Sequence, residues 1–205
     1  MSVTFKRNAG KILWHGDSIT RGRVADTGGW RKSVQAALES ARIDYTSVGP
    51  TTSYSPGMTQ TAHAGTAGAT LSSSTIATAV STYTPNVICI AYGMNDMGGG
   101  TTAAAFLTTL DAAIDACQSA GILDARILIQ KTYLPDSGDY VGYYANLAQY
   151  QAYQSQIAAR AAAQGVTLVD VGDPVKSDGI HPIDGATGYE SMATAMLSAL
   201  LQVIP

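Results

Sequence analysis

The sequence predicts an α/β fold, a three-layer α/β/α sandwich built on a five-stranded parallel sheet. Short apolar runs alternate with amphipathic segments along the whole 205-residue chain, and this is the pattern of repeated βαβ units. The most apolar run, residues 86–91 (NVICIA), is continuous and β-branched, as a strand buried on both faces requires. Right-handed crossovers then favour the strand order 2-1-3-4-5.

In the first part of the chain, strands are expected at residues 11–15, 43–48 and 86–91. Residues 29–41 and 70–83 carry apolar side chains at the spacing of one helical face. These side chains are Trp30, Val34, Leu38 and Ala41 in the first helix, and Ile76, Val80 and Tyr83 in the second. The stretch from Pro50 to about Gly68 is rich in Gly, Ser and Thr and predicts a long loop.

In the second part, strands are expected at residues 126–131 and 166–171, and helices at residues 102–120, 143–164 and 187–202. The apolar faces of the first two helices hold Phe106, Leu110, Ile114 and Cys117, and Leu147, Tyr150, Ile157 and Ala161. Gly121 and Gly165 follow them as helix stops. The strand order is the one known as flavodoxin-like. No linker or repeat divides the chain, so a single domain over residues 1–205 is expected.

The amino-acid composition and charge argue against some classes of function. Hydrophobic residues make up 46% of the chain and charged residues 13%, which is typical of a globular protein. The net charge of −3 argues against a nucleic-acid partner, and no run approaches the ~20 apolar residues of a membrane span. Met1–Gly10 lacks the apolar run of a signal peptide, so the chain as written would be cytoplasmic, and secreted if a leader was removed. The oligomeric state is left open.

The two cysteines, Cys89 and Cys117, fall in an expected strand and an expected helix and lack CxxC spacing. We expect two buried free thiols rather than a disulfide.

Residues able to do chemistry follow four of the predicted strands. Ser18 lies just past the first strand, Gly68 in the loop after the second, and Asn95 just past the third, while Asp178 and His181 follow the fifth. Because the carboxyl ends of parallel strands meet at one edge of a sheet, these residues are expected to converge there.

Ser18 alone would be interpreted as a helix N-cap. A serine becomes a good nucleophile only when a general base removes its proton. His181 has Asp178 three residues before it, on a predicted loop, so one ring nitrogen can meet the carboxylate while the other faces Ser18. The alternative for this pair is a solvated surface turn.

The other histidines, His15 and His63, have no carboxylate at a useful spacing. Structural roles are favoured for both, although His63 lies near the expected crevice. Asp17 and Asp96 flank the site and are expected to brace its loops through backbone N–H groups.

Attack on an ester builds a negative oxygen, and each donor aimed at it contributes ~3 kcal/mol. The candidate donors are the backbone N–H groups of Ser18 and Gly68 and the side-chain amide of Asn95. Gly65 competes with Gly68 for the second place. For Asn95 the alternative is a plain strand-to-helix turn.

These residues resemble the SGNH (GDSL-type) hydrolase superfamily. Its blocks match Gly16-Asp17-Ser18-Ile19-Thr20, a second block containing Gly68, Gly93-Met94-Asn95-Asp96, and Asp178-Gly179-Ile180-His181-Pro182. The resemblance implies Ser18 as the nucleophile, Asp178 and His181 as its partners, and Ser18, Gly68 and Asn95 as the oxyanion hole.

Finer similarity points to the carbohydrate esterase family three branch, which contains acetylxylan esterases. The stretches that carry it are Gly28-Gly29-Trp30-Arg31, Ile43-Asp44-Tyr45 with Val48-Gly49, His63-Ala64-Gly65-Thr66-Ala67-Gly68, and Gly188-Tyr189 after the last block. Ala64 and Ala69 depart from that branch, which commonly has an acidic and a bulky residue there.

The sequence therefore predicts a serine esterase that removes short acyl groups, acetyl above all, from a small-molecule or polysaccharide ester. Residues 65–69 and 94–100 are expected to wall the acyl side, and Met94 and Met97 are their only large apolar residues. The alternative is an apolar groove built from elsewhere in the chain, by Tyr133, Leu134, Tyr140 and Tyr143. The alternatives are a lysophospholipase or thioesterase acting on longer chains and, more remotely, a non-catalytic binding module. Neither an HExxH motif nor a His/Cys cluster occurs, so no metal and no cofactor are expected.

Overall fold

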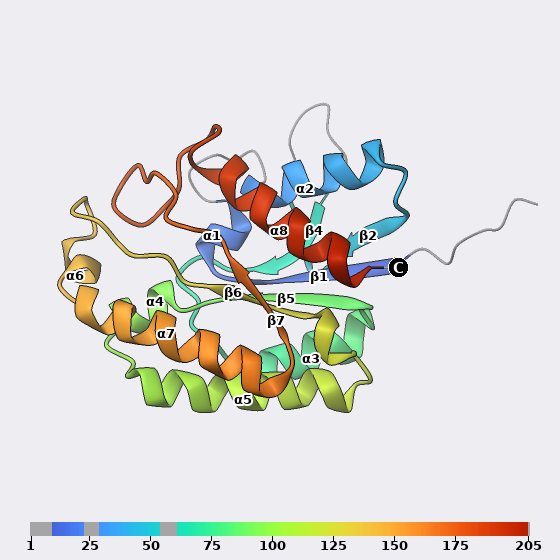
Figure 1. Ribbon diagram of the computed structural model, residues 1–205, viewed down its shortest axis with the longest axis horizontal. Coiled ribbons are helices and arrows are strands. Elements are labelled where there is room, and N and C mark those ends of the chain that lie inside the picture. Colours follow the sequence, from blue (N-terminus) through green and yellow to red (C-terminus); the bar gives the residue numbers. More distant parts are fainter. Residues whose placement is uncertain (1–9, 23–28, 54–60, 205) are drawn as a thin grey trace, which may run out of the picture.

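The computed structural model describes residues 10–22, 29–53 and 61–204, and these form a three-layer α/β/α sandwich (Figure 1). Five parallel strands make its centre, in the order β2-β1-β5-β6-β7. They are β1 (Gly10–Gly16), β2 (Tyr45–Val48), β5 (Val87–Ala91), β6 (Ile127–Lys131) and β7 (Thr167–Asp170). This is the predicted flavodoxin-like order 2-1-3-4-5.

A short hairpin extends the sheet where a loop was predicted. β3 (Thr51–Ser53) pairs antiparallel with β4 (Thr61–Gly65), and β4 pairs parallel with the carboxyl end of β1, beyond the point where β2 ends. The prediction of one long loop is therefore wrong for these two segments. Residues 54–60 of the predicted loop lie outside the described residues, as do Gly28 and residues 1–9.

Helices cover both faces of the sheet (Figure 1). α2 (Gly29–Ser40) and α8 (Tyr189–Val203) pack together on one face. α3 (Ser73–Tyr83), α5 (Ala103–Ser119) and α7 (Leu147–Gln164) cover the other. Shorter helical elements were not predicted. They are α1 (Ser18–Arg21), α4 (Met94–Gly98), the 3₁₀ turn η1 (Asp124–Arg126) and α6 (Val141–Tyr144).

Two of the long helices, α3 and α5, begin at capping side chains, and α7 ends at a glycine. The hydroxyls of Ser72 and Thr102 accept hydrogen bonds from backbone N–H groups three residues later, as N-caps do. Gly165 ends α7 in the left-handed conformation with φ of 68°. Ala41, expected on the apolar face of the first helix, lies beyond the end of α2 and is exposed.

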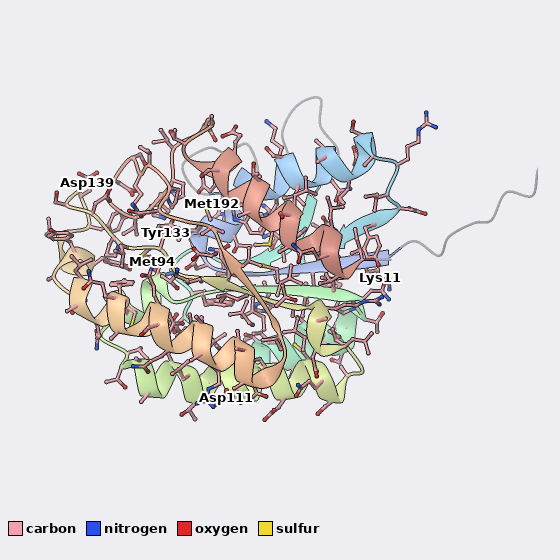
Figure 2. All side chains as sticks on the ribbon, viewed as in Figure 1. Lys11, Met94, Asp111, Tyr133, Asp139 and Met192 are labelled. Carbon is pink, nitrogen blue, oxygen red and sulfur yellow. The ribbon has the colours of Figure 1, made fainter. Side chains whose placement is uncertain are left out.

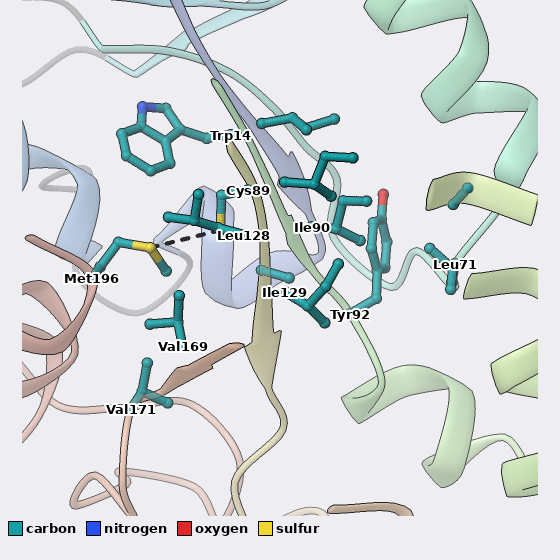
Figure 3. Close-up of a cluster of buried hydrophobic side chains, with 14 of the residues drawn as sticks. Trp14, Leu71, Cys89, Ile90, Tyr92, Leu128, Ile129, Val169, Val171 and Met196 are labelled. Carbon is teal, nitrogen blue, oxygen red and sulfur yellow. Dashed lines mark hydrogen bonds between the residues drawn. The ribbon is translucent and has the colours of Figure 1, made fainter. Parts of the chain in front are cut away.

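The core has a layer on each face of the sheet (Figure 3). Trp14, Cys89 and Met196 lie on one side of the strands, and Ile90 and Tyr92 lie on the other. Cys89 and Cys117 are both buried free thiols, as predicted. Burial of each large apolar side chain in such a core stabilises the fold by about 1.5–3 kcal/mol. Among the described residues, no helix has the length and apolar character that crossing a bilayer demands.

Candidate active site

The predicted site residues come from loops at one end of the sheet. Figure 2 shows Met94 and Tyr133, which follow β5 and β6, at the end opposite Lys11 at the start of β1. Ser18 begins α1 directly after β1, Asn95 lies in α4 after β5, and Asp178 and His181 lie in the loop after β7. Parallel strands place their carboxyl ends together, so this edge is where a ligand crevice is expected.

Ser18, His181 and Asp178 form a continuous chain of hydrogen bonds. Ser18 Oγ lies 2.9 Å from His181 Nε2, and His181 Nδ1 lies 2.7 Å from Asp178 Oδ2. Ser18 is 4% exposed and His181 is fully buried. The residues that the sequence places 163 positions apart are thus in direct contact.

The turn that presents Ser18 is held tightly. Asp17 Oδ1 accepts a hydrogen bond from Ile19 N at 2.9 Å and caps α1. Gly16 has no space for a side chain, because a Cβ there would lie 2.5 Å from the carbonyl oxygen of Ala91 on the neighbouring strand. The glycine therefore lets β1 and β5 approach closely beneath the serine.

Hydrogen bonds in the loop after β7 determine which ring nitrogen of His181 carries a proton. Asp178 Oδ1 accepts hydrogen bonds from the backbone N–H groups of Ile180 and His181, at 3.1 and 2.8 Å. Burial alone would raise the pKa of Asp178, but the hydrogen bonds from the His181 backbone and ring outweigh it and hold the pKa below its usual range. A carboxylate only accepts, so Nδ1 carries a proton and Nε2 of a neutral ring accepts the Ser18 hydroxyl proton.

Asn95 is held by two partners. Its Nδ2 donates to the carbonyl oxygen of Ala69 at 3.0 Å, and its Oδ1 accepts from the hydroxyl of Tyr143 at 3.0 Å. Because a carbonyl oxygen can only accept, the atom that faces Ala69 must be the amide nitrogen. That nitrogen carries two hydrogens. One is used in the hydrogen bond to Ala69, so the other is available for a second hydrogen bond.

The two candidate glycines differ in what their surroundings allow. Gly65 is buried, and its N–H donates to His63 Nδ1 at 2.8 Å. Gly68 is exposed with φ of 73°, and no described atom lies within 4 Å of where its Cβ would be. Thr66 N donates to the carbonyl oxygen of Gly16 at 3.0 Å and ties this loop to the serine turn.

Two buried carboxyl groups flank the site, and both brace backbone, as predicted. Asp17 caps the serine turn, while Asp96 Oδ1 accepts from Leu71 N at 3.0 Å. Burial, together with the nearby charge of Asp96, raises the pKa of Asp17 to about 7, although the hydrogen bond from Ile19 lowers it. Burial likewise raises the pKa of Asp96.

The other two histidines are buried, consistent with structural roles. His63 is fully buried and is 2.8 Å from Gly65 N. His15 is 4% exposed, and its Nδ1 lies 2.8 Å from the hydroxyl of Tyr92. Burial lowers the pKa of His15 to about 4, so the ring is neutral near pH 7.

A cavity of about 550 Å³ lies between α3 and β4, with His15 and Tyr92 among its lining residues. Its described lining includes Thr66 and Ala69 of the site loop but not Ser18, Asn95 or His181. Among the described residues, none of the three side chains in the hydrogen-bonded chain, Ser18, His181 and Asp178, lines this cavity.

Two residues support the site in a way that was not predicted from the sequence. The Tyr133 hydroxyl donates to the carbonyl oxygen of Ile180 at 2.5 Å and anchors the histidine loop. Arg31, fully buried on α2, donates through Nε to the carbonyl oxygen of Thr20 at 2.5 Å. Tyr133 could have been found, because it directly follows the fourth predicted strand, as the chemically active residues do. Within the described ranges, no group of three His, Cys, Asp or Glu side chains is placed to hold a metal ion.

Comparison with known proteins assigns the family. Residues 15–189 match the model of the GDSL-like lipase/acylhydrolase family. The chain belongs to this family. It is thus a carboxylic ester hydrolase, and the matched region spans Ser18, Asn95, Asp178 and His181. A search of curated proteins found no match.

Solved structures of similar fold include several esterases. A carbohydrate esterase family 3 protein from Talaromyces cellulolyticus superposes with a TM-score of 0.77 at 20% identity, covering 95% of this chain and 97% of that one. A family 3 carbohydrate esterase from Clostridium thermocellum gives 0.74 at 22%, covering 96% and 97%. A mutant acetyl esterase solved with an acetate ion gives 0.76 at 20%, covering 95% and 97%. At these identities the likeness is one of fold.

Proposed function

We propose that this acylhydrolase is a serine esterase in which Ser18 is the nucleophile, His181 the general base and Asp178 the partner of the base. The observation that carries this proposal is the unbroken hydrogen-bond chain from Ser18 Oγ through the His181 ring to Asp178. Nucleophile, base and orienting carboxylate are the three groups that acyl transfer by serine needs.

The reaction follows from the proton positions. Ser18 Oγ attacks the ester carbonyl carbon while its proton moves to His181 Nε2, and the resulting imidazolium is stabilised by Asp178. The tetrahedral intermediate then collapses, and the same nitrogen returns the proton to the departing alcohol. Water, deprotonated by His181, attacks the acyl-enzyme in the same way and releases the carboxylic acid.

Three donors would hold the oxyanion: the N–H groups of Ser18 and Gly68 and the remaining Nδ2 hydrogen of Asn95. The N–H of Gly65 is already used by His63 Nδ1, which favours Gly68 for the second position. Hydrogen-bond donors that are already oriented stabilise the oxyanion more than water molecules do, because they need not reorganise when the charge develops.

The proposed substrate is a short acyl ester, acetyl above all, on a carbohydrate. Met94 and Met97, the apolar residues expected to wall the acyl side, are 2% and 0% exposed and so present no open groove. The exposed part of the site loop, Thr66 to Gly68, carries only small residues. Structures of similar fold that are described as acetyl and carbohydrate esterases lend further support.

The direct test is Ser18→Ala, which should leave a folded protein with hydrolysis of p-nitrophenyl acetate lowered by ~10³-fold or more, because triad members act as a unit. A serine-directed phosphonate should label Ser18 alone, as mass spectrometry of digested protein would show. Ser155→Ala, at an exposed position of α7, serves as the control and should keep wild-type rates. Label on another serine, or near-normal activity in Ser18→Ala, would reject the assignment.

A further inference from the structure

Residues 134–146, which we call the strap, connect β6 to α7 and include α6. One part contacts the loop that holds the histidine, since Asp136 N donates to the carbonyl oxygen of Gly179 at 2.9 Å. Its far end contacts α4, where Asn146 Nδ2 donates to the carbonyl oxygen of Met97 at 3.2 Å. Figure 1 shows α6 beside α4 at the carboxyl edge of the sheet. The strap thus touches both halves of the site.

Tyr143, on α6, supplies the contact that matters most for chemistry. Its hydroxyl donates to Asn95 Oδ1 at 3.0 Å, while Asn95 Nδ2 donates to Ala69 at 3.0 Å. The terminal torsion of an asparagine side chain is broad and poorly restrained by itself. With a partner on each side, the plane of this amide is fixed.

We propose that Tyr143 is a positioning residue of the oxyanion hole, holding the Asn95 amide so that its second N–H stays available to the substrate oxygen. This inference rests on the proposed function. A hydroxyl that donates to the amide oxygen also draws electron density away from the amide nitrogen. Hydrogen bonds in such chains strengthen one another, so the remaining N–H becomes a better donor.

The ring of Tyr143 is itself held in place. It packs against Gly98 of α4, and a Cβ at position 98 would overlap the ring. The Tyr140 ring also meets it edge to face, with centroids 5.6 Å apart, and Tyr140 lies edge-on to the His181 ring at 5.7 Å. Aromatic contacts therefore link the base to the residue that orients the oxyanion donor.

The first test is Tyr143→Phe, which keeps the ring and removes only the hydroxyl. For p-nitrophenyl acetate, kcat should fall about five- to tenfold, with KM changed less than about twofold, because the oxyanion forms only in the transition state. Tyr144→Phe is the matched control: it is the next residue of α6 and its side chain is exposed. Its rates should equal wild type.

A double-mutant cycle separates positioning from a merely structural role. Asn95→Ala should lower kcat by ~10²-fold, and adding Tyr143→Phe should then change kcat less than about twofold, because the group it positions is gone. Independent, multiplying losses in the double variant would overturn the inference and leave the proposed function standing. Wild-type kcat in Asn95→Ala would overturn both the oxyanion assignment of Asn95 and the role of Tyr143, whereas Ser18→Ala would still report on the nucleophile.

The contact between Tyr143 and Asn95 can also be tested through Gly98, against which the Tyr143 ring packs. Gly98→Ala adds a methyl group where the Tyr143 ring packs, and its backbone conformation is one that alanine adopts. It should reduce kcat by a similar five- to tenfold factor and add less than about twofold to the loss in Tyr143→Phe. Unchanged kcat in both Gly98→Ala and Tyr143→Phe, with unfolding midpoints near wild type, would refute the proposed role of Tyr143.

Discussion

Asp17 lies one residue before the proposed nucleophile, with only 2% of its surface exposed. Its carboxyl group caps the serine turn, yet burial raises its pKa from the ordinary 3.8 to about 7, helped by the charge of Asp96. None of the described residues forms an ion pair with Asp17, and a buried carboxylate without a cationic partner is costly. The turn therefore holds Ser18 in place at some expense in stability at neutral pH.

Asp17→Asn tests this cost. Below pH ~4 the carboxyl is protonated in both the folded and the unfolded chain. Between pH 4 and about 7 the unfolded chain loses the proton first, so wild-type stability falls by up to about 1.4 kcal/mol per pH unit. Asparagine keeps the capping oxygen and does not titrate. In urea unfolding, the stability of the variant relative to wild type should rise across this window, and a difference independent of pH would contradict the prediction.

At the scale of single residues, the sequence is informative where a reactive side chain directly follows a strand. Ser18, Asn95 and the Asp178–His181 pair could be predicted to converge because parallel strands align their carboxyl ends, and hydrogen bonds do join Ser18, His181 and Asp178. Tyr143 could not be predicted as the partner of Asn95. It lies 48 residues away in the connection between β6 and α7, and helical periodicity does not show which residues of two separate connections are in contact.

At the scale of the structural elements, the strap contains two glycines that differ in the space around them. Gly138 lies against the histidine loop, where a Cβ would be 2.5 Å from the carbonyl carbon of Asp178. Gly142 lies in α6, and no described atom comes within 4 Å of its Cβ position. Neither glycine has a positive φ. An alanine at either position therefore tests whether the site has room for a methyl group, without adding backbone strain.

Gly138→Ala should lower the free energy of unfolding by ~1–3 kcal/mol, because the methyl group forces the strap away from the Asp178 turn. Its kcat/KM should fall at least severalfold, since that turn holds the partner of His181. Gly142→Ala is the matched control and should keep both activity and stability or gain up to ~1 kcal/mol from helix propensity. Urea unfolding and ester hydrolysis measure the two effects, and equal behaviour of the two variants would show that the strap does not support this turn.

The elements that the sequence misses also have a physical reason. β3 and β4 lack the apolar alternation of a strand, and they form because the exposed edge of β1 beyond β2 offers backbone partners. In the segment before α7, Tyr143, Leu147 and Tyr150 keep helical spacing, which predicts one helix from residue 143. The chain instead forms α6 and begins α7 separately at Leu147.

At the scale of the whole molecule, the loop from Thr66 to Thr70 contacts two regions. Thr66 N donates to the carbonyl oxygen of Gly16 in the serine turn, and Thr66, Ala69 and Thr70 line the cavity of about 550 Å³ between α3 and β4. Tyr133, considered from the sequence as part of an acyl groove, is 1% exposed, and its hydroxyl is bonded to Ile180. The described residues beside Ser18 thus provide no long apolar channel.

The dependence of activity on acyl chain length should follow from the lack of a long apolar channel among the described residues beside Ser18. Each buried methylene contributes ~0.8 kcal/mol, but only if an apolar groove receives it. With p-nitrophenyl esters from acetate to palmitate, kcat/KM should be highest for acetate or at most butyrate and should fall steeply by octanoate. Thr78→Trp, which fills the cavity of about 550 Å³ from an exposed position on α3, should leave that dependence unchanged. A profile rising to octanoate would reject the short-acyl assignment, and its loss in Thr78→Trp would place the acyl tail in that cavity, with the proposed Ser18–His181–Asp178 chemistry retained.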